Sequence, residues 1–256
     1  MRTSPHKRAR IVEAPRATEP AGPSPFAPLV ELQADGRSDE ALKKIHRLLL
    51  ERILANQNGV REFSAGAYLH DFRVAVRRTR TGLRQLKGVY PRCQAQHVAG
   101  EFRWLSITTG AARDLEVFLA SMDPLAAAES VATTDELAPF RAFLRRSERA
   151  ERRRCTEALE QPRYRLLISE WADFLQQPCG TQDLPRAAQR PTVEVATESI
   201  ARAYKRLVRR GAEVDLSSPG AAFHRLRLDC KKLRYLLEFF GGLFDHVLQH
   251  GFIQNG

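Results

Sequence analysis

Two segments of the sequence repeat the same arrangement of histidine and basic residues. The first, HDFRVAVRRTR, begins at His70, and the second, HRLRLDCKKLR, begins at His224. The repeated positions are His70, Arg73, Arg77, Arg78 and Arg80 in the first copy, and His224, Arg227, Lys231, Lys232 and Arg234 in the second. Arginine binds phosphate oxygens through paired hydrogen bonds and stays charged at any cellular pH. The repeat therefore predicts a site for a phosphate-rich anion.

The spacing of the repeat places its cations on one side of a helix. Residues at offsets of 0, 3, 7, 10 and 14 lie within an arc of roughly 80°. The first copy then forms one stripe, roughly 21 Å long, which consists of His70, Arg73, Arg77, Arg80 and Arg84. Aligned like charges repel by roughly 0.2–0.5 kcal/mol per exposed pair. A long, linear and uniformly charged anion would offset this repulsion, and its phosphates would be contacted without sequence being read.

The opposite side of each motif helix is apolar. In the first copy this face consists of Phe72, Val76, Leu83 and Leu86, and in the second of Leu226, Cys230, Leu233, Leu237 and Phe240. Such a division predicts that each helix buries one face and exposes its cations on the other.

Other interpretations of these residues remain open. A run of charge on one helix is more often a solvated face, and a single histidine is more often structural, although two copies in register favour binding. Each histidine would then act as a neutral donor or as a cation. Sequence-nonspecific binding of RNA or DNA is the second choice of function, because the same cations would contact a nucleic-acid backbone. An enzyme is the third, since only Asp71 and Asp229 stand near the motifs; no catalytic residue, cofactor or metal site is predicted.

The composition agrees with a polyanionic partner. The 256 residues include 41 Lys and Arg against 30 Asp and Glu, for a net charge of +11, and a basic surface attracts polyanions. The longest stretch without a charged residue is about 11 residues, whereas a membrane span needs roughly 20. The N-terminus lacks the apolar run of a signal peptide. Four scattered cysteines indicate reduced thiols, and we expect a cytoplasmic protein without a membrane span.

Apolar periodicity predicts an all-α protein of seven to nine helices. Residues 1–37 hold six of the 14 prolines and are predicted to form a flexible tail. From Ser38 onward, apolar residues recur at intervals of three and four, as in a helix that buries one face. The same pattern recurs near 69–89, 95–121, 136–160, 163–176, 193–210 and 221–240. Prolines and a glycine in 178–191 mark a linker between a first half, 38–177, and a second half, 192–256.

The two motifs resemble those of the CHAD family, the conserved-histidine α-helical domains. His70 to Arg80 resembles the family's first histidine motif, and His224 to Tyr235 the second. The segment 103–119 resembles the family's Gly-x-x-Arg-Asp helix, with Gly110, Arg113 and Asp114 at the named positions. Together these motifs extend the resemblance over most of residues 38–245.

The resemblance implies two pseudo-symmetric four-helix bundles with a basic channel between them. It also implies non-catalytic binding of inorganic polyphosphate and association with polyphosphate granules. The implied contacts are the ten repeat residues, Arg84 and, as a weaker candidate, Arg113. The second half is shorter than in the family, so its bundle is expected to be truncated. The Glu-x-Glu-x-Lys signature of the triphosphatase domain that many relatives carry is absent, and hydrolase activity is not expected.

Overall fold

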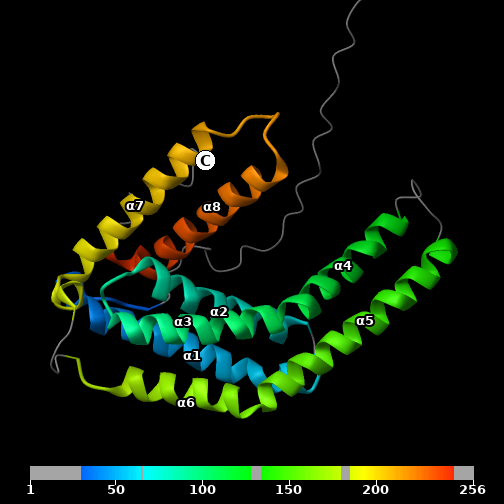
Figure 1. The fold of residues 1–256 in the computed structure, drawn as a ribbon, viewed down its shortest axis with the longest axis horizontal. Coiled ribbons are helices and arrows are strands. Elements are labelled where there is room, and N and C mark those ends of the chain that lie inside the picture. The colour runs from blue at the N-terminus through cyan, green and yellow to red at the C-terminus, as the bar shows by residue number, and fades with distance from the viewer. Residues whose placement is uncertain (1–29, 65, 128–133, 180–184, 245–256) are drawn as a thin grey trace, which may run out of the picture.

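The computed structural model describes residues 30–64, 66–127, 134–179 and 185–244. The predicted all-α fold is confirmed, because the elements in these ranges are helices (Figure 1). They are α1 (Ser38–Arg61), α2 (Ala67–Gln85), α3 (Arg92–Thr108), α4 (Gly110–Ala127), α5 (Thr134–Glu160), α6 (Pro162–Gln176), the 3₁₀ helix η1 (Arg186–Gln189), α7 (Thr192–Ala212), α8 (Gly220–Phe240) and the 3₁₀ helix η2 (Gly241–Leu243).

Helix α1 supplies the centre of the core. Asp39 and Glu40 lie in its first turn, where acidic side chains favour a helix N-terminus. The predicted apolar stripe is fully buried, and its members are Leu42, Ile45, Leu49 and Ile53. Each such side chain contributes roughly 1.5–3 kcal/mol when it leaves water.

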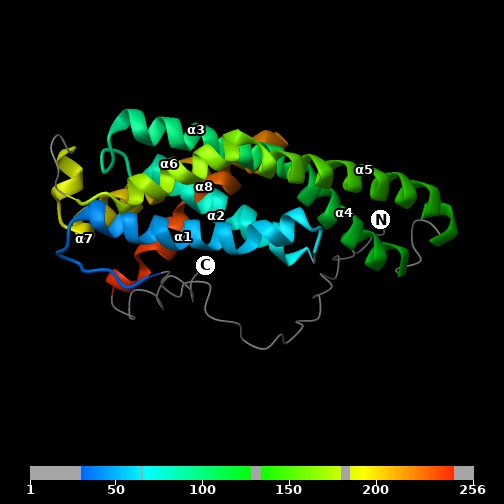
Figure 2. The ribbon, with the colours of Figure 1, turned by 90° about the horizontal axis from the view of Figure 1, so that it is seen from below.

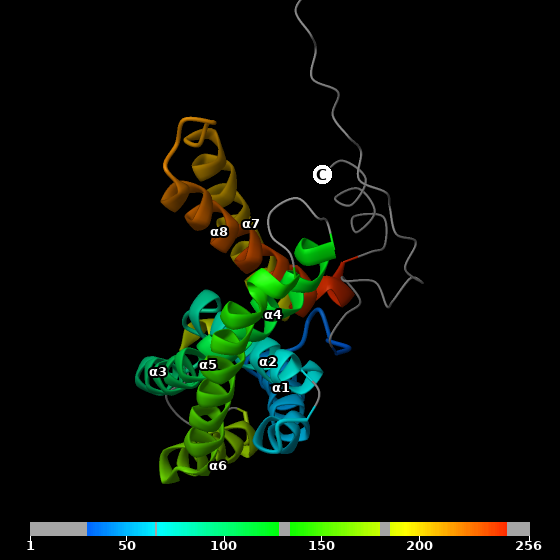
Figure 3. The ribbon, with the colours of Figure 1, turned by 90° about the vertical axis from the view of Figure 1, so that its right-hand side faces the viewer.

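The first six helices pack around this core. Helix α1 contacts α2, α5 and α6, while α2 contacts α3 on its other side. Helices α4 and α5 pair and extend together beyond the end of the bundle (Figure 2). Helices α7 and α8 form a separate pair that projects from one side (Figure 3). Because α8 contacts α2 and α7 contacts α1, the helices that carry the two motifs meet.

The second half of the described chain is a helix pair with a short 3₁₀ turn. The predicted arrangement of two pseudo-symmetric four-helix bundles, with 192–256 as the incomplete one, stays a prediction, because residues 245–256 lie outside the described residues. The predicted helix over 95–121 is two helices, which meet at Thr109.

The boundary of the predicted N-terminal tail needs a correction. Residues 1–29 lie outside the described residues, but the end of the predicted tail belongs to the fold. The backbone N–H of Thr192 donates to Gly36 O at 2.8 Å, and that of Val193 donates to Ala34 O at 3.0 Å. The tail residues accept these bonds through their carbonyl oxygens, while the start of α7 supplies the N–H donors. This contact ties the start of α1 to the start of α7.

A buried histidine in the core makes stability depend on pH. Burial lowers the pKa of His46 from 6.5 to about 3, partly opposed by the Thr79 backbone. Its Nδ1 lies 3.0 Å from the Tyr90 hydroxyl, and its ring packs edge-on to Trp171. Between pH 6.5 and 3 the unfolded chain binds a proton at this residue that the folded chain excludes, so stability falls as pH falls. We expect a loss on the order of 5 kcal/mol over this window.

Denaturant unfolding at several pH values measures this effect. Carboxylates also titrate in the same window, so the comparison is with a His46→Gln variant, whose stability should depend less steeply on pH. Parallel pH profiles for the two proteins would show that His46 is not responsible.

Candidate anion-binding site

The two motif helices meet where Arg77 and Arg78 of α2 face α8. Arg77 Nη1 donates to the Tyr235 hydroxyl at 3.4 Å. Arg78 binds Glu238 Oε2 through Nε at 2.9 Å and through Nη2 at 2.7 Å. Tyr235 and Glu238 are each only 3% exposed, so this contact is an interior one. It brings two segments together that are about 150 residues apart in the sequence.

Cations from both motif copies converge on Lys231. Burial lowers the pKa of the Lys231 ammonium, and so do the positive charges of Arg227, Arg77 and Arg234, in that order. Arg77 belongs to α2, whereas the other three belong to α8. A group whose charged form is disfavoured by neighbouring cations gains from a nearby anion. The structure therefore joins the two predicted stripes into one surface.

The surface continues along α2 to a residue that the sequence interpretation missed. Burial lowers the pKa of the Arg80 guanidinium, and the charges of Arg84, Arg103 and Arg77 lower it further. Its Nε is buried without a hydrogen-bond partner. Arg103 lies on α3, exposed next to the buried Phe102. Arg103 reaches the stripe only because α3 packs beside α2. Its position on the outside of a predicted helix was the signal that the sequence contained.

Six cations in this region have no carboxylate partner within the described part of the chain. We call them the cationic surface, and they are Arg77, Arg80, Arg84, Arg103, Arg227 and Lys231. An anion that runs from α8 along α2 to α3 would contact all of them.

Four other predicted contacts are engaged in ion pairs. Arg78 pairs with Glu238, Arg234 Nε lies 3.2 Å from Glu238 Oε1, Lys232 Nζ lies 2.7 Å from Asp229 Oδ1, and Arg113 Nη1 lies 2.6 Å from Glu116 Oε2. Asp229, which also pairs with Arg210, is 2% exposed. Buried carboxylates are costly unless cations compensate them. This cost gives Arg78, Arg234 and Lys232 a structural role beside the predicted one, whereas Glu116, the partner of Arg113, is only part-buried.

Arg73 was predicted to face the ligand, but it is half-buried and turned toward the α3–α4 junction. Its Nη1 donates to Ser106 O and to the Thr109 hydroxyl, both at 2.9 Å. The last carbonyls of a helix lack partners within that helix, and Arg73 satisfies one of them where α3 ends. Burial lowers the pKa of Arg73, but a guanidinium remains charged at neutral pH. The residue anchors the break between α3 and α4.

Replacing Arg73 should therefore lower stability. We expect Arg73→Met to cost about 2–3 kcal/mol, because hydrogen bonds from a charged group are worth roughly 1.5–3 kcal/mol and the Ser106 carbonyl loses its donor. Urea unfolding measures the change. Arg84→Met is the control, since Arg84 is exposed on the same helix and should change stability by less than about 0.5 kcal/mol. Equal stability of the two variants would contradict the anchoring role.

The apolar face of α2 is confirmed, whereas that of α8 is corrected. Phe72, Val76, Leu83 and Leu86 are buried as predicted. In α8, Cys230 is exposed, and Leu226, Leu233 and Leu237 are only half-buried. The fully buried residues of α8 gather near its C-terminal end, at Tyr235, Leu236, Phe239 and Phe240. This is the part of α8 that meets the first bundle.

Both motif histidines are exposed near the N-terminal ends of their helices. His70 lies in the first turn of α2 and His224 near the start of α8. Neither ring has a hydrogen-bond partner among the described residues. Their predicted role toward phosphate stays a prediction.

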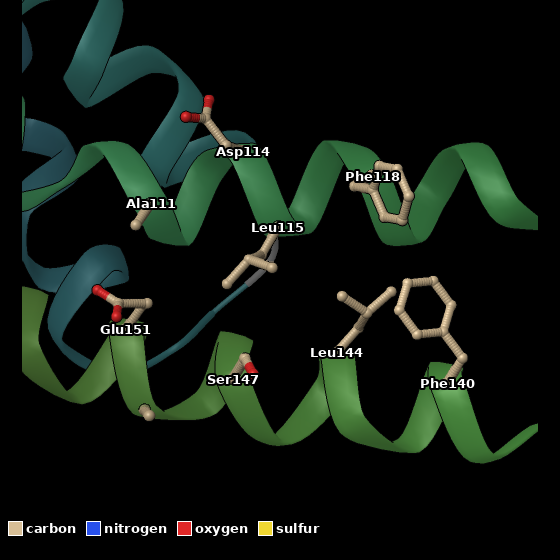
Figure 4. A pocket seen from close by; sticks show the side chains of 9 residues that line it. Ala111, Asp114, Leu115, Phe118, Phe140, Leu144, Ser147 and Glu151 are labelled. Carbon is tan, nitrogen blue, oxygen red and sulfur yellow. The ribbon is translucent and has the colours of Figure 1, made fainter.

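A groove on the α4–α5 pair has the wrong charge for an anion. Leu115 and Phe118 of α4 face Leu144 and Phe140 of α5 (Figure 4). The charged residues that line it are Asp114 and Glu151, which would repel phosphate. In the described ranges no group of three His, Cys, Asp or Glu side chains is placed to hold a metal ion. No helix there is long and apolar enough to cross a membrane.

Comparisons with known proteins show the family and the fold. The model of a family described as CHAD domain matches residues 26–251. The crystal structure of the CHAD domain from the plant Ricinus communis is 28% identical, with a TM-score of 0.72, over 89% of this chain and 75% of that one. PptA from Streptomyces chartreusis is 18% identical, with a TM-score of 0.62, over 84% of this chain and 79% of that one, which supports the fold alone. A search of curated proteins found no match.

Proposed function

We propose that this chain, which belongs to the CHAD domain family, binds inorganic polyphosphate on its cationic surface. The observation that carries the proposal is the convergence of Arg77 from one motif copy with Arg227 and Arg234 from the other on the Lys231 ammonium. The polyphosphate association of the family supports the same ligand.

A linear phosphate polymer fits the distribution of charge. The cations of α2 follow one side of a helix, and those of α8 and α3 lie beside them. Each phosphate unit carries a negative charge, so a chain of them neutralises successive cations and removes their repulsion. Nucleic acid, the alternative, would use the same cations, but single-strand binders also place stacking aromatics along such a surface. Tyr235, which contacts Arg77, is buried.

Titration calorimetry with long-chain polyphosphate at several salt concentrations tests the proposal. We expect saturable binding that weakens steadily as salt rises, because each phosphate contact displaces a counterion. Competition with RNA of equal total charge separates the two ligands. RNA that displaces polyphosphate at equal charge concentration would favour the nucleic-acid alternative, and no binding of either would reject both.

We further propose that binding is not accompanied by hydrolysis and that it places the protein on polyphosphate granules in the cytoplasm. Incubation with polyphosphate and Mg²⁺ or Mn²⁺ should release no phosphate. A fluorescent fusion should follow the granules in cells that accumulate polyphosphate and become diffuse in cells that do not. Phosphate release that disappears in His70→Ala would overturn the non-catalytic assignment.

A further inference from the structure

A cavity of about 710 Å³ is lined by the end of α2, by the segment that follows it and by α3. Its apolar part is formed by Leu83, Leu86, Tyr90, Ala95 and Ala99, and its charged part by Arg84, Lys87, Arg92 and Arg103. None of the residues that line it carries a carboxylate. Its size falls within the range of small-molecule sites, about 300–1,000 Å³.

The lining of this cavity suits a ligand that has both an anionic part and an apolar part. The four cations suit phosphate groups. The apolar part suits a hydrophobic or aromatic body, which polyphosphate does not possess. Leu83 and Leu86 are nearly fully buried and Ala95 and Ala99 are partly buried against the core, so this wall is a firm surface of the bundle. The cavity therefore has a feature that the proposed function leaves unexplained.

The charged part of the cavity adjoins the cationic surface. Arg84 and Arg103 line the cavity, and both also act on the guanidinium of Arg80. A ligand with its body on the apolar wall would therefore direct its phosphates toward Arg84 and Arg103. Lys87 and Arg92 also line the cavity but do not belong to the cationic surface.

Gly100 lines the cavity without a side chain of its own. It lies within α3, where glycine costs roughly 0.5–1 kcal/mol relative to alanine. A Cβ atom at this position would meet no atom within 4 Å, so packing does not demand a glycine. The residue nevertheless lines the cavity, and a large side chain here would occupy it.

We propose that this cavity binds a nucleotide, with its base and sugar against the apolar wall and its phosphates between Arg84 and Arg103. A nucleotide combines a flat, largely apolar ring with a short phosphate chain, which is the combination that the lining residues fit. The site goes beyond the proposed function, because its apolar wall, Gly100, Lys87 and Arg92 take no part in binding polyphosphate.

Binding of three probes to the full chain tests the site. Calorimetry compares ATP with adenosine, which lacks phosphates, and with tripolyphosphate, which lacks the ring. We expect ATP to bind at least tenfold more tightly than either. Tripolyphosphate that binds as tightly as ATP would show that the ring is not recognised and would overturn the proposal.

Substitutions at Gly100 locate the ATP. Gly100→Phe should weaken ATP binding at least tenfold and leave the affinity for long-chain polyphosphate within threefold, while Gly100→Ala should retain both. Arg92→Glu, at an exposed position that lines the cavity, would introduce a carboxylate that repels the phosphates of ATP, and it tests the site should the phenylalanine variant fail to fold. ATP binding that both variants retain would overturn the proposal. If the unmodified protein binds ATP but does not bind polyphosphate, the proposed function is rejected instead.

Discussion

Reversing the charges of Arg227 and Lys231 together is expected to weaken polyphosphate binding by at least about 100-fold. Each charge-assisted hydrogen bond contributes roughly 1.5–3 kcal/mol, and tenfold in affinity corresponds to about 1.4 kcal/mol. The new carboxylates would also repel phosphates bound to Arg77. Neither residue pairs with a carboxylate in the described part of the chain, so the fold should survive, which a thermal melt would verify.

The matched control reverses two arginines away from the cationic surface. Arg145 and Arg149 are exposed on α5, and no carboxylate pairs with either within the described ranges. The double variant Arg145→Glu, Arg149→Glu lowers the net charge by the same four units as Arg227→Glu, Lys231→Glu. We expect its affinity to stay within about threefold at 0.15 M salt, where exposed charges more than about 8 Å apart are largely screened. Equal losses in the two variants would mean that total charge, not the site, determines binding.

The position of the α2 stripe could be predicted from sequence because helix geometry alone fixes it. Arg77, Arg80 and Arg84 lie on the side opposite Phe72 and Val76, and the bundle buries those two completely. The apolar face of α8 was predicted less well, because the N-terminal half of this helix, residues 220–230, buries only Asp229. Cys230 therefore remains exposed although its spacing fits an apolar face.

The partners of the arginines could not be predicted, because they depend on which helices meet. Arg77 and Arg78 are adjacent in sequence, yet about 100° apart around the helix. One joins the cationic surface, and the other reaches Glu238, which is 160 residues away. The same reason explains Arg103, which becomes part of the site through the packing of α3. The repeat identifies the candidate cations, and tertiary contacts decide which of them remain free.

Breaking the ion pair between α2 and α8 is the second change from which we expect a large effect, in this case on stability. Glu238 is 3% exposed and pairs with two arginines, Arg78 and the half-exposed Arg234. Removing one partner of a buried ion pair typically costs about 3–5 kcal/mol, because a buried charge loses its compensation. Arg234 still compensates Glu238 in part, so we expect Arg78→Met to lose about 2–4 kcal/mol of stability in urea unfolding.

The double variant Arg78→Met, Glu238→Met separates a structural role from a ligand contact. Apolar side chains of similar size often replace a buried ion pair without loss of stability, so the second substitution should recover most of what the first removes. If Arg78 acts only by joining α2 to α8, polyphosphate affinity in the double variant returns to within threefold of the unmodified protein. If Arg78 binds phosphate directly, stability recovers but affinity stays reduced by tenfold or more. The double variant thus distinguishes a cation that positions the surface from one that belongs to it, since both substituted residues lie where the two copies of the motif meet.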